Sequence, residues 1–133
     1  MYEEKKLAIV GSREFIDWSL LVQETRKFID ELDFKITHIV SGGARGADAM
    51  GKKFARNHRL RYEEYSADWE KYGNSAGMIR NKEIVDNSDA VILFWDGKSS
   101  GTKNTLETVM ARGLPHVLVI YEKSDIDEWE DED

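Results

Sequence analysis

Short apolar segments alternate along this chain with longer amphipathic segments, and this alternation constrains the fold more than any other feature. Five short runs have the composition of β-strands: 6–10, 36–40, 60–65, 90–95 and 116–121. Four longer segments have apolar residues at helical spacing or helix-terminating residues: 17–32, 48–58, about 75–87 and about 101–112. Strands alternating with helices in this way predict an α/β protein with a parallel sheet and right-handed crossovers.

The length and the distribution of charge predict one domain followed by an acidic tail. A chain of 133 residues is sufficient for one domain with a sizeable core, which we place at residues 1–121. Residues 122–133 contain eight acidic residues and one lysine, which equals the whole net charge of −7. The body of the protein is therefore neutral, and the positions of its cations matter more than the total charge.

The composition excludes several kinds of site. The chain has no cysteine, which excludes disulfides, thiolate metal sites and a cysteine nucleophile. Its three histidines, at positions 38, 58 and 116, fall outside the strand-to-helix loops, so we expect neither a metal site nor a serine–histidine triad. No apolar run is long enough to span a membrane, and residues 1–6 show no secretory signal, so we expect a soluble cytoplasmic protein with no membrane partner.

The loops that follow the first four predicted strands combine glycines with cations. These loops are 11–14, 41–48, 68–81 and 96–102; they hold eight of the ten glycines and the cations Arg13, Arg45, Arg80 and Lys98. In a parallel sheet the carboxyl ends of the strands share one edge, where ligands bind. Glycine allows close approach of the backbone, and helix N-termini offer unpaired amides, so we expect an anionic ligand. The alternative is that these glycines serve only the tight turns between strand and helix and do not indicate a ligand.

Four short motifs follow one another in a distinctive order. They are Gly-Ser-Arg at 11–13, Ser-Gly-Gly-Ala-Arg-Gly-Ala-Asp at 41–48, Ala-Asp-Trp at 67–69 with Ala-Gly-Met-Ile-Arg-Asn at 76–81, and Ser-Gly-Thr at 100–102. This order resembles the SLOG superfamily, which groups LOG-type nucleotide phosphoribohydrolases with Smf/DprA DNA-processing proteins. The most similar branch is the YspA, or cpYpsA-related, SLOG family. The resemblance covers about residues 6–121.

The resemblance implies a Rossmann-like three-layer α/β/α sandwich with a five-stranded parallel sheet. It also implies a nucleotide-like ligand, such as NAD, ADP-ribose or a nucleoside monophosphate, while no cofactor is identified. The expected ligand-binding residues are Gly11, Ser12, Arg13, Ser41, Gly42, Gly43, Arg45, Gly46, Asp48, Arg80, Asn81, Gly101 and Thr102. A homodimer is the expected association, because dimers are the commonest oligomers of soluble proteins.

The chain departs from the LOG-type enzymes in its last loop. Those enzymes carry Pro-Gly-Gly-x-Gly-Thr-x-x-Glu, whose glutamate supports cleavage of the N-glycosidic bond. With Gly101 and Thr102 aligned, the glutamate position is occupied by Thr105. Glu107, two residues further on, points about 200° away around a helix and is not a simple substitute. The glutamate that LOG-type activity uses is therefore absent at this position, whereas phosphate binding is still expected.

Arginine and aromatic side chains are the main candidates for ligand contacts. Arg45 and Arg80 are the first candidates for phosphate, because a guanidinium forms bidentate, charge-assisted hydrogen bonds. The alternative for Arg80 is a cap or an ion pair with a nearby acid, at position 83 or 86. Trp69 and Tyr72 either stack on a nucleobase or close the long loop onto the sheet or form a dimer contact.

Three aspartates are candidate catalytic groups. Asp48 has the chemistry to accept from a ribose hydroxyl or to act as a base, or alternatively to cap its helix. Asp68 and Asp96 follow strands and are candidate general bases, although aspartate is also an ordinary turn residue.

Three functions are consistent with these residues. The first is a nucleotide-binding protein that senses or processes its ligand. The second is a hydrolase that cleaves the N-glycosidic or phosphate linkage of such a ligand with the aspartates. The third, single-stranded nucleic-acid binding, is disfavoured by the neutral body and the absence of a basic stripe with interleaved aromatics.

Overall fold

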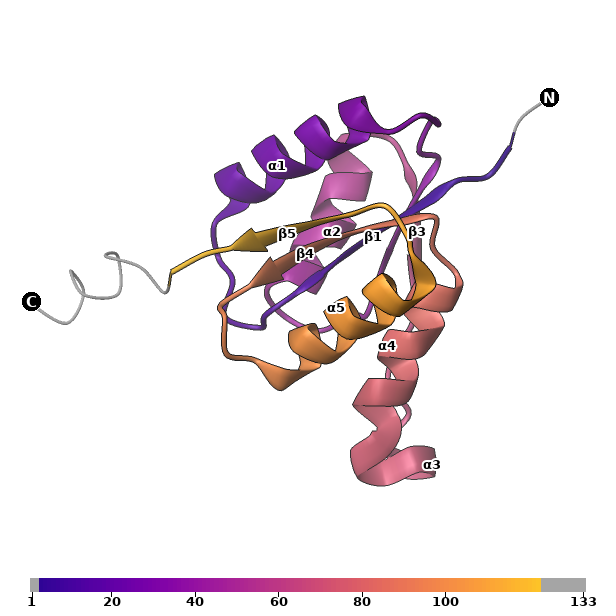
Figure 1. Cartoon of the computed structure of the whole chain (residues 1–133), viewed down its shortest axis with the longest axis vertical. Coiled ribbons are helices and arrows are strands. Elements are labelled where there is room, and N and C mark those ends of the chain that lie inside the picture. Colours follow the sequence, from indigo (N-terminus) through magenta and orange to yellow (C-terminus); the bar gives the residue numbers. More distant parts are fainter. Residues whose placement is uncertain (1–2, 123–133) are drawn as a thin grey trace, which may run out of the picture.

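A computed structural model describes residues 3–122, so the predicted acidic tail lies outside the described residues except for Glu122. Figure 1 shows the chain as alternating strands and helices. The elements are β1 (Lys6–Gly11), α1 (Trp18–Glu31), β2 (His38–Ser41), α2 (Ala47–Asn57), β3 (Arg61–Glu64), α3 (Trp69–Tyr72), a 3₁₀ turn η1 (Gly73–Ser75), α4 (Ala76–Asp86), β4 (Ala90–Trp95), α5 (Ser100–Arg112) and β5 (His116–Ile120).

The five strands form one parallel sheet in the order β3-β2-β1-β4-β5. This arrangement confirms the predicted Rossmann-like α/β fold. The chain builds outward from β1 to β3 and then returns to place β4 on the other side of β1, where Gly11 pairs with Phe94. The carboxyl ends of β1 and β4 therefore flank the switch point at which such sheets bind ligands.

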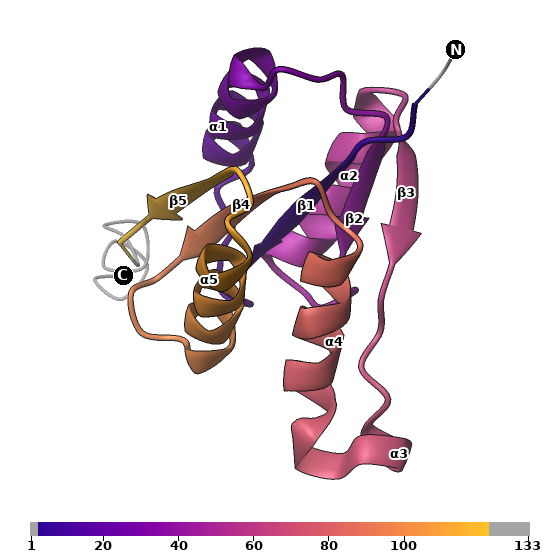
Figure 2. The ribbon, with the colours of Figure 1, turned by 45° about the vertical axis from the view of Figure 1, so that its right-hand side comes forward.

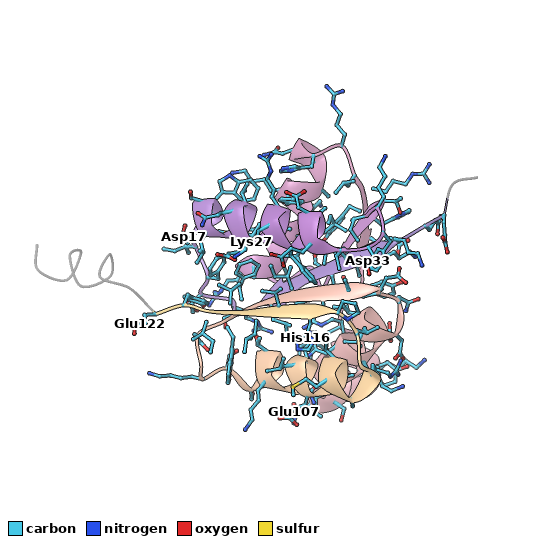
Figure 3. All side chains as sticks on the ribbon, turned by 45° about the horizontal axis from the view of Figure 1, so that its top comes forward. Asp17, Lys27, Asp33, Glu107, His116 and Glu122 are labelled. Atoms are coloured by element: carbon cyan, nitrogen blue, oxygen red, sulfur yellow. The ribbon has the colours of Figure 1, made fainter. Side chains whose placement is uncertain are left out.

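Helices cover both faces of the sheet, as the predicted three-layer sandwich requires (Figures 1 and 2). One buried cluster joins the sheet to α1 and α2 through side chains such as Leu21, Phe28 and Phe54. The other joins it to α4 and α5 through Ile84, Val85 and Val109. Because both faces are covered, β4 is buried almost throughout, which explains its nearly continuous apolar sequence. Figure 3 shows Lys27 of α1 and Glu107 of α5 on opposite sides of the sheet.

The segment between β3 and α4 differs from the prediction. No helix was expected between the strand at 60–65 and the helix at about 75–87, but this segment contains helix α3 and the turn η1, so the described residues hold five α-helices rather than four. Asp68 caps α3 by accepting a hydrogen bond of 3.1 Å from the amide of Lys71. No residue of α3 is buried, so the helix has no apolar periodicity from which it could be recognised. Figures 1 and 2 show α3 at the end of α4 that is far from the sheet.

Candidate functional site

A cavity of about 460 Å³ lies at the carboxyl edge of the sheet. Its walls come from the loops after β1, β2 and β4, from the start of α5 and from α3 and α4. Ten candidate residues line it: Gly11, Ser12, Arg13, Asp48, Trp69, Arg80, Asn81, Asp96, Gly101 and Thr102. Residues from four separate loops are therefore brought to one place by the parallel strands.

A second depression, of about 410 Å³, adjoins this cavity on the side of β2 and β3. It is lined by Gly42, Gly43 and Arg45, and it shares Arg13, Ala44, Trp69 and Arg80 with the main cavity. Arg13 and Arg80 thus line both spaces and stand at their junction.

Two glycines allow the loops to pack closely behind the cavity. A Cβ on Gly11 would lie 2.3 Å from the carbonyl oxygen of Phe94. Gly46 has a φ of +78°, and a Cβ there would lie 2.5 Å from the carbonyl oxygens of both Ser12 and Arg13. A side chain at either position would collide with these carbonyl groups. The close packing of the backbone alone therefore explains why both residues are glycine.

Hydroxyl groups form a connected wall between β1 and α5. The Oγ atoms of Ser12 and Ser99 are 3.2 Å apart, and Ser99 Oγ donates to Thr102 Oγ1 over 3.1 Å. The amide of Asp96 donates to Ser12 Oγ over 3.2 Å. Ser12 and Thr102 are buried, so this wall presents fixed hydroxyl oxygens rather than mobile surface side chains.

The N-terminus of α5 opens into the cavity beside these hydroxyls. The N-cap residue, Ser99, makes no side-chain capping hydrogen bond. Ser100, Gly101 and Thr102 line the cavity, and the first-turn amides of a helix have no acceptor within the helix itself. Unpaired amides and the positive end of the helix dipole favour an anionic group at this position.

Arg80 is held in place by a backbone carbonyl of the loop after β2 and by its neighbour on α4, Asn81. Its Nη1 donates to the carbonyl oxygen of Gly42 over 2.8 Å, and its Nε donates to Asn81 Oδ1 over 3.0 Å. Asn81 Nδ2 in turn donates to the carbonyl oxygen of Gly101 over 3.4 Å. Within residues 3–122 Arg80 forms no ion pair with Glu83 or Asp86, so the alternative interpretation of this arginine is not observed.

Asp48 is a buried carboxylate in the cavity wall, with 4 % of its surface exposed. Burial raises the pKa of Asp48 to about 6, although the charge of Arg80 and the amides of Ala44, Gly42 and Gly11 act in the opposite direction. The N-cap of α2 is Gly46, without a side-chain capping bond, so Asp48 does not cap its helix. Its carboxylate is instead surrounded by the backbone amides of Gly11, Gly42 and Ala44 and lies in the wall of the cavity.

The other two aspartates are engaged by backbone amides. Asp68 caps α3 and does not line the main cavity. Asp96 lines the cavity, but its Oδ1 accepts from the amides of Ser99 and Lys98 over 2.8 and 2.9 Å. These bonds, that of Ser99 above all, lower the pKa of Asp96 from its ordinary value, which makes it a weak base.

Two predicted ligand residues have other partners in the structure. The Nη2 atom of Arg45 lies 2.6 Å from Oε1 of Glu14 in an ion pair with both side chains exposed. Ser41 is fully buried; its hydroxyl donates to the carbonyl oxygen of Asp48 and lies 2.6 Å from the hydroxyl of Tyr62. Arg45 reaches the depression rather than the main cavity, and Ser41 lines neither.

The part of the cavity wall that α3 and the start of α4 form, here called the outer wall, contains the predicted Trp69 and the unpredicted Met78. Trp69 lines both spaces and is half exposed, whereas Tyr72 lines neither and packs beside Lys71. Met78, which was not predicted, lines the main cavity with 59 % of its surface exposed. A large apolar residue two positions before a predicted binding arginine is the signal that could have identified it.

Thr105, at the position of the LOG-type glutamate, also lines the cavity. Its Oγ1 donates to the carbonyl oxygen of Gly101 over 3.0 Å, and the residue is buried. Its hydroxyl is thus used within α5, and a threonine at this position supplies no carboxylate to the cavity.

The described part of the chain contains no cluster of three histidine, cysteine or acidic residues that could hold a metal ion. The histidines lie outside the cavity: His38 Nδ1 is 2.7 Å from Thr37 Oγ1, His58 stacks on Phe54, and His116 contacts Leu114. Between residues 3 and 122 no helix is both long enough and apolar enough to cross a membrane.

Comparisons with known proteins agree with this fold. The model of the YAcAr family, described as the YspA, cpYpsA-related SLOG family, matches residues 5–72. Gene 61 protein of Mycobacterium phage D29 is 32 % identical over 121 residues, covering 84 % of this chain and 93 % of that protein. The X-ray structure of DNA processing protein A (DprA) from Streptococcus pneumoniae matches with a TM-score of 0.67 at 20 % identity. That match covers 92 % of this chain and 52 % of DprA, so the chain spans about half of the DprA length and the likeness shows the fold alone.

Proposed function

Because the chain belongs to the YspA, cpYpsA-related SLOG family, we propose that it binds a nucleotide or nucleotide-derived ligand in the main cavity. The ligand class includes nucleoside monophosphates, ADP-ribose and NAD. The observation that carries the proposal is the convergence of a guanidinium, buried hydroxyls and the open N-terminus of α5 on one space. All three are phosphate-binding groups.

The size and the polarity of the cavity support this ligand class. A volume of about 460 Å³ is in the range of ordinary small-molecule sites. The phosphate is expected at the start of α5, near Gly101 and Thr102. The exposed side chains of Trp69 and Met78 on the outer wall offer apolar surface for a base.

Binding without rapid turnover is the form of this function that the site supports best. Asp68 lies outside the cavity, Asp96 is a weakened base, and Thr105 has no carboxylate. Asp48 alone among the three candidate aspartates combines a place in the wall with a pKa raised to about 6, in the range of a general base. Hydrolysis of the bound ligand that uses Asp48 is therefore the second candidate function.

One experiment distinguishes these two functions. The protein is incubated separately with AMP, ADP-ribose and NAD; its melting temperature is measured and the solution is analysed by chromatography. A rise in melting temperature without new products supports a binding protein. Release of ribose 5-phosphate, adenine or nicotinamide that is lost in Asp48→Asn supports a hydrolase. No thermal shift and no product with any of the three nucleotides would contradict the proposal.

Two further expectations concern partners. Single-stranded DNA is expected to bind weakly, and strong, steeply salt-dependent binding of an oligonucleotide would contradict this. A homodimer stays a prediction, and the molar mass in solution from light scattering tests it.

Glu14→Gln is expected to tighten nucleotide binding about two- to fivefold, with the larger effect at low salt. Glu14 lines the cavity and pairs with Arg45 at its edge, so its charge both repels an anionic ligand and occupies a cation. Isothermal titration with AMP at two salt concentrations measures the effect. Glu31→Gln, at the end of α1, is the matched control, and an equal gain in that variant would contradict a local role for Glu14.

A further inference from the structure

The carboxylate of Asp48 is buried beside the cavity, and the hydrogen bonds that it accepts within the described residues come from backbone amides. The amide of Ala44 donates to its Oδ2 over a long 3.3 Å, and the amides of Gly42 and Gly11 lie nearby. Burial of a charged group is costly unless donors satisfy it. Because Asp48 also lines the cavity, a bound ligand is well placed to supply further donors.

The surroundings of Asp48 restrict the chemistry of those donors. The point at which a Cβ of Gly42 would stand is 2.7 Å from Asp48 Oδ2 and 2.8 Å from Arg80 Nη1, so carboxylate and guanidinium are close neighbours. An incoming cation would be repelled by Arg80, and a phosphate placed directly on Asp48 would be repelled by the carboxylate. A neutral O–H donor meets neither repulsion, and a vicinal pair of hydroxyls can serve both carboxylate oxygens.

The order of the strands gives the position of Asp48 along the edge of the sheet. Trp69 follows β3, and the start of α5 follows β4. Asp48 follows β2 and lies among amides at the end of β1 and after β2. In the sheet order β3-β2-β1-β4, Asp48 therefore lies between the aromatic wall and the helix terminus. A nucleotide has the same sequence of parts: base, sugar, phosphate. Its sugar falls beside Asp48 when its phosphate is on α5 and its base is near Trp69.

We propose that Asp48 accepts hydrogen bonds from the ribose hydroxyls of the ligand and selects ribonucleotides over deoxyribonucleotides. The inference rests on the proposed function, since it assigns the sugar of the nucleotide to one residue of the same cavity. A hydrogen bond from the 2′-hydroxyl to Asp48 would also distinguish this site from a DNA-binding site, because the sugar of DNA lacks that hydroxyl.

The test compares AMP with 2′-deoxy-AMP and 2′,3′-dideoxy-AMP by isothermal titration at pH 7.5, where Asp48 is ionised. AMP is expected to bind at least about tenfold more tightly than the dideoxy analogue, because hydrogen bonds to a charged group are lost. In Asp48→Asn and Asp48→Ala the ratio is expected to fall below about threefold. Asp30→Asn, a carboxylate change on the exposed side of α1, is the control in which the wild-type ratio persists.

The outcomes separate this inference from the proposed function. Equal affinity of the wild-type protein for AMP and dideoxy-AMP overturns the inference and leaves nucleotide binding standing. A preference for AMP that is unchanged in both folded Asp48 variants also overturns the assignment to Asp48. Absence of binding by AMP, ADP-ribose and NAD alike overturns both. The wild-type comparison needs no variant, so it decides the sugar preference even where a substitution impairs folding.

Discussion

Arg80→Ala is expected to weaken nucleotide binding by about 30- to 150-fold, or about 2–3 kcal/mol. The guanidinium is fixed by its hydrogen bonds to Gly42 and Asn81, and it borders both the main cavity and the adjoining depression. A cation held in this way contributes charge-assisted hydrogen bonds to a phosphate with little further loss of side-chain freedom. Isothermal titration with the tightest-binding nucleotide of AMP, ADP-ribose and NAD measures the loss.

Two further variants make the result specific to Arg80. Arg80→Lys keeps the charge but loses the planar fork, so its affinity is expected to lie between those of the wild type and Arg80→Ala. Arg56→Ala removes an exposed cation from the last turn of α2, remote from the cavity lining, and is expected to bind like the wild type. Wild-type affinity in a folded Arg80→Ala variant would contradict the role given to this residue.

Asp48→Asn is expected to raise the free energy of unfolding at pH 7 by about 2–3 kcal/mol. The folded protein raises the pKa of Asp48 from 3.8 to about 6, chiefly through burial, so ionisation of this group above pH 6 acts against folding. An asparagine of the same shape carries no charge and avoids this cost. Urea denaturation of both proteins at pH 7 measures the difference.

The pH dependence gives a second readout of the same effect. Between pH 4 and 6 the folded protein holds a proton on Asp48 that the unfolded chain releases, so the stability from this group is lost as the pH rises. The wild-type protein should therefore approach the stability of Asp48→Asn as the pH falls from 7 to 5. Asp30→Asn should show no such convergence. Parallel pH profiles of wild type and Asp48→Asn, or a less stable Asp48→Asn at pH 7, would contradict this prediction.

Much of the fold could be predicted because its signals are local. Segment 90–95 was predicted at its observed bounds, since burial of both faces of β4 leaves a continuous apolar run. The end of α5 at Arg112 was also predicted, and Gly113 follows it in the left-handed conformation, with a φ of +65°, which glycine adopts readily. Helix α3 was missed because a four-residue, exposed helix held by the cap of Asp68 carries no periodic signal.

The position of the candidate site could be predicted better than its contacts. The carboxyl ends of parallel strands meet at one edge, so loops far apart in the sequence were expected to converge, and ten of the predicted residues line one cavity. The partners of each side chain depend on distances in the folded chain. The pairing of Arg45 with Glu14 and of Ser41 with Tyr62 joins residues 31 and 21 positions apart. The burial of Asp48 beside Gly42 and Arg80 likewise has no counterpart in the local sequence, which left a ribose contact, a base and a helix cap as open alternatives.

An NMR titration of the ¹⁵N-labelled protein with AMP tests the central claim, a nucleotide site at the carboxyl edge of the sheet, most directly. The amide signals of Ser12, Gly101 and Thr102 are expected to shift together and to saturate at one equivalent of ligand. The cavity of about 400 Å³ between α1 and α2, bordered by Arg26, Phe34 and His58, serves as the internal reference. Shifts centred on those residues, or no saturable shift at the start of α5, would contradict the account.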